Sequence, residues 1–248
     1  MTISLPRGLL AKACERFRRA DRFAFHYARG KLGGDAIFAE LLRSGLLTDA
    51  RRILDLGSGQ GSLFALLLAA DEAFEQGQWP RGWAKPPKPV QMRGVELMAR
   101  DVWRAAQAFG ADHPVVHVEQ GDMNAVDFGH CDVVTILDAL HYFDFDLQRR
   151  VLERIRDAVG PGGRFITRVG DQSAGLPFKL SMWVDQVVTF SRGHRLPRLY
   201  CRPVADWCAL LRDIGFDVEV KPMSGALPFA NTMLVCQVRH PGTAPSMA

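Results

Sequence analysis

The sequence contains no long hydrophobic run. No uninterrupted apolar stretch among its 248 residues approaches the roughly 18 residues that a membrane-spanning helix needs. The first ten residues, MTISLPRGLL, also lack the basic start, extended apolar stretch and small-residue cleavage site of a secretory leader. With 48% hydrophobic and 23% charged residues, the composition is that of an ordinary enzyme. We therefore expect a cytoplasmic protein that makes no integral membrane contact.

Paired cysteines and clustered acids are missing as well. The five cysteines form no CxxC pair, which argues against a zinc knuckle and for reduced thiols. Aspartates are frequent, but none belongs to a recognisable paired-acid cluster of the kind that binds a divalent metal ion. We therefore expect no metal site.

A phosphate-binding P-loop is also absent, because no segment matches the pattern GxxxxGK followed by Ser or Thr. The chain has instead a glycine turn, ILDLGSGQG at residues 53–61, in which glycine recurs at every second position. Glycines at such a turn remove Cβ atoms where a ligand contacts the main chain. Dinucleotide-binding turns follow the spacing GxGxxG, but here Ser62 stands where that pattern has its last small residue. The turn predicts a small-molecule site and disfavours a dinucleotide.

From residue 51 onward, short β-branched runs alternate with helix-like stretches, which is typical of a doubly wound parallel sheet. Only the short segment MSGALPFAN joins the last two strands, so they should pair antiparallel. We therefore predict an α/β fold with a doubly wound, mostly parallel seven-stranded sheet and an antiparallel C-terminal hairpin. The predicted strands cover residues 52–56, 91–96, 115–119, 132–137, 163–169, 217–221 and 232–239, and the helices between them cover 61–75, 98–109, 146–159 and 203–214.

Ahead of the sheet, the hydrophobic spacing predicts an amphipathic helix over residues 6–29 and a second helix over 34–44. We expect these helices to form a lid on the substrate site. The predicted organisation is a helical lid at 1–48, an α/β domain at 49–240 with a substrate insertion at 171–202, and a flexible tail at 241–248.

The turn Asp55-x-Gly57-x-Gly59-x-Gly61 resembles the first motif of the class I S-adenosylmethionine-dependent methyltransferases. The resemblance covers roughly residues 50–170 and extends more loosely to residue 239. It implies that S-adenosyl-L-methionine is the cofactor and S-adenosyl-L-homocysteine the product. The cofactor-binding residues that it implies are Asp55, Gly57, Ser58, Gly59, Gly61, Glu96, Leu97, Gly121, Asp122, Met123 and Asp138.

In that family, acids that follow successive strands have distinct roles. Glu96, at the end of the second strand, matches the acid that binds the ribose hydroxyls; taken alone, it could be a solvated strand end. Asp122, with Met123 beside the ring, matches the acid that meets the adenine amino group; taken alone, it could initiate a turn. Both acids stand at the carboxyl end of a strand, where open α/β sheets bind their ligands.

Three residues after the fourth and fifth strands are candidates for the chemistry. An imidazole ordinarily titrates near neutral pH, so His141 could serve as a base, or it could cap a helix or stack on Tyr142. Arg168 and Asp171 could orient a polar acceptor, or they could pair with each other. The fourth strand ends in DALH at 138–141, not in the Asn/Asp-Pro-Pro-aromatic turn of enzymes that methylate exocyclic amines of bases. We therefore do not expect DNA as a substrate.

Two segments, 22–38 and 176–200, are predicted to form the substrate site, and both are rich in aromatic residues and arginines. Their rings could wall a flat aromatic or polyene acceptor, or they could pack in the core. Residues 1–31 carry a net charge of +6 and residues 179–202 one of +4. This excess would suit an acceptor carried on coenzyme A or an acyl carrier protein, or it could mark solvated helix faces. The predicted substrate-binding residues are His26, Tyr27, Arg29, Tyr142, Phe178, Trp183 and Tyr200, with Phe23, Phe25 and Phe190 as further wall candidates.

The stretch HYARGKLGGD at residues 26–35 is similar to methyltransferases found with bacterial aryl-polyene pigment pathways, which belong to secondary metabolism. We therefore predict an enzyme that methylates oxygen or carbon of a small aromatic or carrier-bound acyl acceptor. Three alternatives stay open. They are an RNA methyltransferase, suggested by the basic N-terminus, a non-catalytic cofactor-binding protein and a nicotinamide oxidoreductase.

Overall fold

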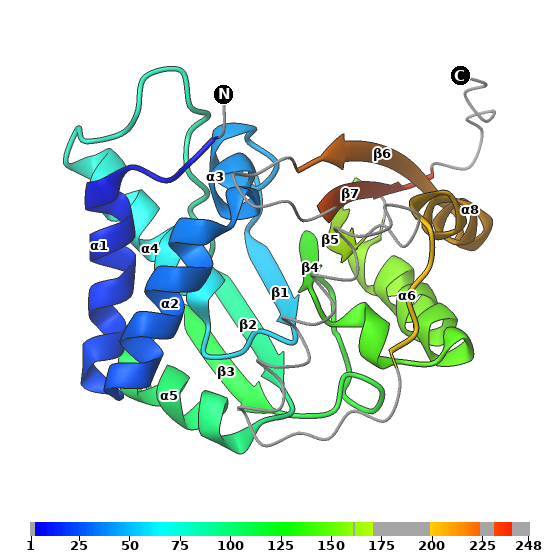
Figure 1. Ribbon diagram of the computed structural model, residues 1–248, viewed down its shortest axis with the longest axis horizontal. Helices are drawn as coiled ribbons and strands as arrows, with labels where there is room; N and C mark the ends of the chain where they lie inside the picture. The colour runs from blue at the N-terminus through cyan, green and yellow to red at the C-terminus, as the bar shows by residue number, and fades with distance from the viewer. Residues whose placement is uncertain (1–2, 161, 171–198, 224–230, 240–248) are drawn as a thin grey trace.

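The computed structural model describes residues 3–160, 162–170, 199–223 and 231–239. The strands in these residues form a seven-stranded sheet in the order β3-β2-β1-β4-β5-β7-β6 (Figure 1). The strands are β1 Arg52–Leu56, β2 Gln91–Glu96, β3 Val116–Gln120, β4 Val133–Leu137, β5 Arg164–Gly170, β6 Phe216–Pro222 and β7 Asn231–Val238.

The first five strands pair parallel, and β7 runs antiparallel between β5 and β6. The predicted fold, a mostly parallel sheet with an antiparallel C-terminal pair, is confirmed. β4 is buried along its whole length, as expected for a strand that is covered on both faces. The strand order reverses between β1 and β4. Open α/β sheets bind ligands at the carboxyl ends of the strands beside such a reversal, so this edge is where a site is expected.

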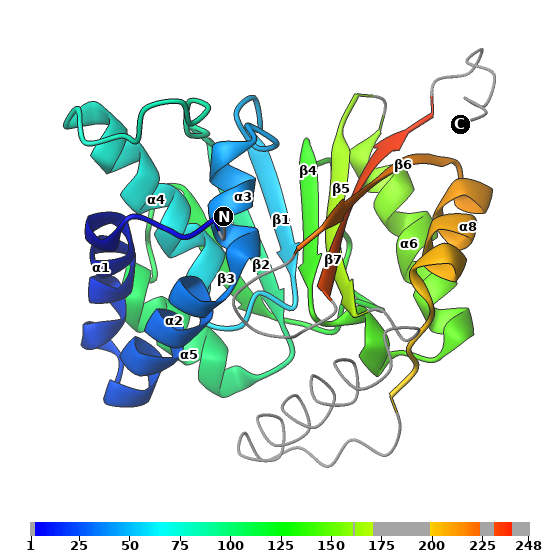
Figure 2. The same cartoon turned by 45° about the horizontal axis from the view of Figure 1, so that its top comes forward.

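Helices cover both faces of the sheet (Figure 2). In β1, Ile53 belongs to the core on one face and its neighbour Leu54 to the core on the other, because successive side chains of a strand alternate. The helices between the strands begin and end within one residue of the predicted bounds. One face carries α1 Arg7–Glu15, α2 Arg22–Gly34, α3 Ala36–Arg43, α4 Ser62–Glu75 and α5 Ala99–Phe109, and the other carries α6 Phe145–Val159 and α8 Val204–Ile214.

The prediction of one long helix over residues 6–29 is wrong. The chain forms α1 and α2 there, separated by the 3₁₀ turn Arg16–Arg19. Asp21 starts α2, because its carboxylate accepts the amide of Ala24 at 2.6 Å and so caps the new helix. The turn carries Phe17 into the core, where it is completely buried. The N-terminal helices therefore share a core with the sheet, and a domain boundary near residue 48 stays a prediction.

Two features are missing from the described part of the chain. No helix in it is long and apolar enough to cross a bilayer. Its histidines, cysteines, aspartates and glutamates form no group of three that could hold a metal ion.

Candidate functional site

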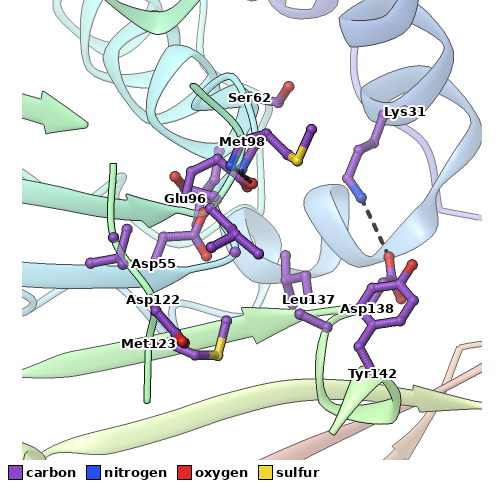
Figure 3. Close-up of a pocket in the computed structure, with 18 of the residues that line it drawn as sticks. Lys31, Asp55, Ser62, Glu96, Met98, Asp122, Met123, Leu137, Asp138 and Tyr142 are labelled. Atoms are coloured by element: carbon purple, nitrogen blue, oxygen red, sulfur yellow. Dashed lines mark hydrogen bonds and ion pairs between the residues drawn. The ribbon is translucent and has the colours of Figure 1, made fainter. Parts of the chain in front are cut away.

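A pocket of about 280 Å³ opens at the carboxyl ends of β1 to β4 (Figure 3). Each of these four strand ends contributes to its wall, and α2 closes one side. Every residue predicted to bind the cofactor lines this pocket, with the exception of Gly61. The wall includes Asp55, Gly57, Ser58 and Gly59 from the end of β1 and its turn, Glu96, Leu97 and Met98 from the end of β2, Gly121, Asp122 and Met123 after β3, Asp138 and Ala139 after β4, and Tyr27 and Lys31 from α2.

The turn after β1 has a backbone that glycine adopts without strain. Gly57, Gly59 and Gly61 have φ angles of +75°, +57° and +80°. A Cβ on Gly57 would lie 3.1 Å from the Cβ of Ala139, in the pocket wall. A Cβ on Gly61 would lie 2.8 Å from the ring of Phe109. Gly61 therefore serves the packing of the turn against α5, which explains why it lies outside the wall.

The amides of this turn are bonded within the protein. Gly57 and Ser58 both donate to the carbonyl of Val95, at 2.8 and 3.3 Å, and Gly61 donates to the carbonyl of Ser58 at 3.0 Å. Gly94 of β2 permits this close approach, because a Cβ there would lie 2.6 Å from Ser58 Oγ. The Ser58 hydroxyl itself is buried in the pocket wall and has no hydrogen-bond partner among the described residues.

Glu96 ties the glycine turn to the end of β2. Its Oε2 accepts the amide of Gly59 at 2.8 Å, and its Oε1 accepts the amide of Met98 at 2.9 Å. The residue is only 9% exposed, so Glu96 is not the solvated strand end that the sequence left open. Each carboxylate oxygen can accept a second hydrogen bond. The group that organises the turn can therefore still receive hydroxyl donors from a ligand.

Asp55 is the buried acid at the end of β1. Burial raises the pKa of its carboxyl to about 7. The hydrogen bond from Thr135 Oγ1, at 2.6 Å, and the charge of Lys31 lower this pKa, whereas the charge of Glu96 raises it. Asp55 is therefore balanced between its protonated and ionised forms near neutral pH, and a cation in the pocket would favour the ionised form.

Asp122 follows β3, where it begins a turn and also lines the pocket; its contact with adenine stays a prediction. Its Oδ1 accepts the backbone amide of Asn124 at 2.9 Å and the side-chain amide of the same residue at 2.7 Å, so it does begin a turn. It also lines the pocket, with Met123 next to it in Figure 3. Leu97, which is 60% exposed, contributes to the wall from the end of β2.

Asp138, after β4, is the non-glycine residue with a positive φ, +66°, in the described part of the chain. Arg168 of β5 donates to both of its carboxylate oxygens, with Nε 2.5 Å from Oδ1, and the ammonium of Lys31 lies 3.3 Å from Oδ2. Arg168 also binds Asp35, which caps α3. The other partner considered for Arg168, Asp171, falls outside the described residues. This network joins the N-terminal helices to the ends of β4 and β5 and holds Asp138 in its unusual conformation.

His141 lies in the 3₁₀ turn η2 Leu140–Tyr142 and is not among the residues that line the pocket. The centre of its ring is 4.3 Å from that of Tyr142. Burial lowers the pKa of the imidazole to about 4, so the ring is neutral and a weak base near pH 7. The two ring planes are tilted by 59°, so His141 packs against Tyr142 without stacking on it. Arg168 does not line the pocket either, and catalytic roles for these residues stay predictions.

The residues predicted to bind the acceptor separate into three groups. Tyr27 and Tyr142 line the pocket. His26, Arg29 and Tyr200 do not belong to its described lining. Phe178 and Trp183, like Asp171, lie outside the residues that the structure describes.

Sequence reasoning missed several wall residues. Lys31 could have been found, because it follows Tyr27 by four residues and therefore shares its face of α2. The apolar members carry no local signal that distinguishes a pocket wall from a core. The missed residues are Lys31, Phe38, Ser62, Leu63, Val95, Met98, Leu137, Ala139 and Phe143.

The chain is similar to known proteins in sequence pattern and in fold. A family model described as a methyltransferase domain matches residues 22–220. No match was found among the curated proteins. Human N-acetylserotonin methyltransferase, solved in complex with SAM, is similar with a TM-score of 0.57 and 18% identity, over 95% of this chain and 61% of that chain. The chain thus spans about three fifths of the human protein's length.

A second similar structure is the magnesium protoporphyrin IX methyltransferase of Synechocystis PCC 6803 with bound SAH. Its TM-score is 0.56 at 18% identity, and the match covers 94% of this chain and 96% of that chain. At these identities the likeness shows a shared fold.

Proposed function

The chain belongs to the methyltransferase domain family, and from that premise we propose that it transfers the methyl group of S-adenosyl-L-methionine to an oxygen or carbon atom of a small acceptor. The observation that supports this best is the bond between the Glu96 carboxylate and the Gly59 amide. This bond holds together two parts of one pocket, at the carboxyl ends of two adjacent parallel strands. One part is a carboxylate that can accept hydrogen bonds from two hydroxyl groups, and the other is a glycine turn that has no side chains to block a ligand.

The pocket suits a nucleoside that carries no phosphate. The amides of Gly57, Ser58, Gly59 and Gly61 are all bonded within the protein, and the last acceptor in that set is the carboxylate of Glu96. A pyrophosphate at this turn would find few free amides and would meet a negative charge. A ribose, by contrast, has two hydroxyl donors for the oxygens of Glu96, and an adenine amino group is a donor for Asp122. This argues against a nicotinamide dinucleotide.

The acidic wall suits a cationic cofactor. When bound, S-adenosylmethionine supplies a methyl group on a positively charged sulfur, which makes that methyl group electrophilic. The carboxylates of Asp55 and Asp138 line the pocket on either side of the sheet reversal, at the ends of β1 and β4. The space that a Cβ on Gly57 would fill, beside Ala139 in the pocket wall, is a further feature that a bound nucleoside could occupy.

The contribution of the protein to methyl transfer is alignment and the exclusion of water, which can be worth about 7–11 kcal/mol. Tyr27 and Tyr142 present rings to the pocket, and Tyr27 stacks on Phe23 with 5.8 Å between ring centres and 14° between ring planes. Such rings offer flat apolar contact together with a hydroxyl group. We infer a small aromatic acceptor on this ground, with a carrier-bound acyl group as the alternative.

The basic N-terminus gives limited support to an RNA substrate or to an anionic carrier. Lys12 and Arg16 both pair with Glu72, at 3.3 Å for Lys12, and Arg18 pairs with Glu15 at 2.7 Å. Part of the positive charge is therefore neutralised within the fold. Binding to a polyphosphate needs several unneutralised cations along one surface.

The cofactor is tested by mass spectrometry of the small molecules that remain bound to the purified protein, together with calorimetric titration with S-adenosylhomocysteine. We expect S-adenosylhomocysteine in the eluate and saturable heat in the titration. Absence of both would contradict the proposal.

The acceptor is tested with deuterated-methyl S-adenosylmethionine and a panel of phenols, aryl carboxylates, acyl-coenzyme A esters and transfer RNA. We expect the label in a small aromatic compound. Label in RNA alone would replace the proposed acceptor with an RNA, and label in no compound despite cofactor binding would favour a non-catalytic protein.

A further inference from the structure

We propose that Lys31 binds the α-carboxylate of the cofactor's amino-acid end, and so determines which way round the cofactor lies. The inference rests on the proposed function. Lys31 belongs to α2, lines the pocket and points from its helix toward Asp138, with 3.3 Å between its ammonium and Oδ2 (Figure 3).

The charges of the pocket wall single out this residue. Four carboxylates line the pocket, whereas Lys31 is the one cationic side chain in the part of the wall that the structure describes. S-adenosylmethionine carries two positive groups, its sulfonium and its α-ammonium, and one negative group, its α-carboxylate. A carboxylate next to this acidic wall is repelled unless a cation accompanies it. Lys31 is the described group that can meet that need.

The position of Lys31 agrees with this role. Glu96 and Asp122, which we assign to the ribose and the adenine, stand at the ends of β2 and β3. Asp138, the partner of Lys31, follows β4, on the other side of β1 in the sheet. Figure 3 shows Lys31 and Asp138 together, across the pocket from Glu96 and Asp122. An adenosine over β2 and β3 therefore directs the amino-acid end across β1 toward Lys31.

The ammonium of Lys31 can accept this partner without abandoning Asp138. It has three N–H donors, and its bond to Asp138 uses one of them. Asp138 also receives two bonds from Arg168, so its charge does not depend on Lys31 alone. The Lys31 side chain is 27% exposed, and a bound ligand would remove water from it and strengthen the new ion pair.

The experiment compares two ligands that differ only beyond the sulfur. S-adenosylhomocysteine carries the amino-acid end, whereas 5′-methylthioadenosine keeps the nucleoside and the sulfur without the carboxylate. Calorimetric affinities are measured for the wild type, Lys31→Met, Lys31→Arg and Lys12→Met. Lys12 is the matched control, because its ammonium pairs with Glu72 on α4 and does not line the pocket.

We expect Lys31→Met to weaken binding of S-adenosylhomocysteine by roughly ten- to hundred-fold, the range of a charge-assisted hydrogen bond. Its affinity for 5′-methylthioadenosine should stay unchanged. Lys31→Arg should retain most of the affinity for S-adenosylhomocysteine, since it keeps the charge, and Lys12→Met should change neither affinity.

Equal loss for both ligands would overturn the inference, because Lys31 would then only support the fold of the pocket. No loss for either ligand would overturn it as well. If the wild type binds neither ligand, the proposed function fails instead, so the two failures are distinguishable. Thermal unfolding verifies that each variant folds, and Lys31→Gln, which keeps a donor for Asp138, takes the place of Lys31→Met if that variant does not.

Discussion

The carboxylate of Glu96 accepts the amide of Gly59 at 2.8 Å, so that the last residue of β2 holds the turn that follows β1. The two residues are 37 positions apart, and they meet because β1 and β2 lie parallel with their carboxyl ends aligned. The bond places a negative charge inside a glycine turn. A glycine turn of this kind could otherwise bind a phosphate, but with this carboxylate it favours ligands that carry hydroxyl donors or a positive charge.

Glu96→Gln should weaken binding of S-adenosylhomocysteine by roughly ten-fold or more and should lower the melting temperature. The side-chain amide would turn a donor toward the amide of Gly59 or of Met98, and the charge-assisted bonds would be lost. Calorimetry and thermal unfolding measure the two effects. Glu119→Gln is the control, because Glu119 pairs with Arg93 outside the pocket. Unchanged affinity in Glu96→Gln would contradict the assignment of Glu96 to the ribose.

A comparison of Gly57→Ala with Gly110→Ala should separate the effect of backbone strain on stability from the effect of pocket shape on cofactor binding. Both glycines have positive φ, +75° and +87°, so each alanine would strain the backbone and should cost about 1–3 kcal/mol of stability. A Cβ on Gly57 would also intrude beside Ala139, whereas one on Gly110 would have nothing within 4 Å. We expect both variants to melt earlier and only Gly57→Ala to lose cofactor affinity in calorimetry. Equal affinities in the two variants would show that the pocket tolerates the extra methyl group.

Asp55→Asn should remove a pH dependence of stability. The folded pKa of Asp55 is about 7, against an ordinary value of 3.8. Between these values the folded protein keeps a proton that the unfolded chain has released, so the free energy of unfolding falls as the pH rises, by up to about 1.4 kcal/mol per pH unit. Urea unfolding from about pH 4.5 to 7 should show this decline for the wild type relative to Asp55→Asn. Parallel curves would rule out the raised pKa.

His141→Gln should change the pH dependence in the opposite direction. The folded pKa of His141 is about 4, against an ordinary 6.5. Between these values the unfolded chain binds a proton that the folded protein does not, so the wild type loses stability as the pH falls. The variant should lose less over the same range in urea unfolding. If the pH profile of methyl transfer has an inflection near 6.5 that the variant abolishes, His141 titrates during turnover and its pKa in the active enzyme is not lowered.

Arg168→Met should destabilise the fold by about 3 kcal/mol, the lower end for a broken buried ion pair, because Asp35 loses its cation whereas Asp138 keeps Lys31. Urea unfolding at neutral pH measures the loss. Arg149→Met is the control, because Arg149 pairs with Asp213 on the surface, and it should leave the unfolding curve nearly unchanged. Similar curves for the two variants would show that the Arg168 network does not stabilise the N-terminal helices against the sheet.

Local patterns were sufficient for most of the architecture. The predicted bounds of the helices between the strands differ from those observed by at most one residue, because the spacing of apolar residues and the turn residues report directly on local structure. The prediction failed at residues 6–29, where the apolar pattern continues although the helix is interrupted by a 3₁₀ turn. Asp21 is a good helix cap, but its role depends on the bend before it. That bend places Phe17 in the core, against Phe109 of α5.

The candidate site was predicted less evenly. Asp55, Glu96 and Asp122 could be assigned to it because each stands at a strand end, and parallel strands bring their ends to one edge. The partial burial of His141 and the contact of Lys31 with Asp138 had no such signal. They depend on how a loop and a helix pack over the sheet, which spacing along the chain does not report.

By itself, the sequence determined the strand and helix order, the antiparallel C-terminal pair and the glycine turn with its following acids, because these depend on residue period, connection length and backbone freedom. The tertiary structure alone decided which groups meet. It joined Glu96 to Gly59 across two strands, left the half-buried His141 outside the described pocket wall and brought Lys31 of α2 to the pocket. The physical reason is that a side chain's charge state and partners follow from desolvation and contact between elements distant in sequence, and only the packed fold supplies both.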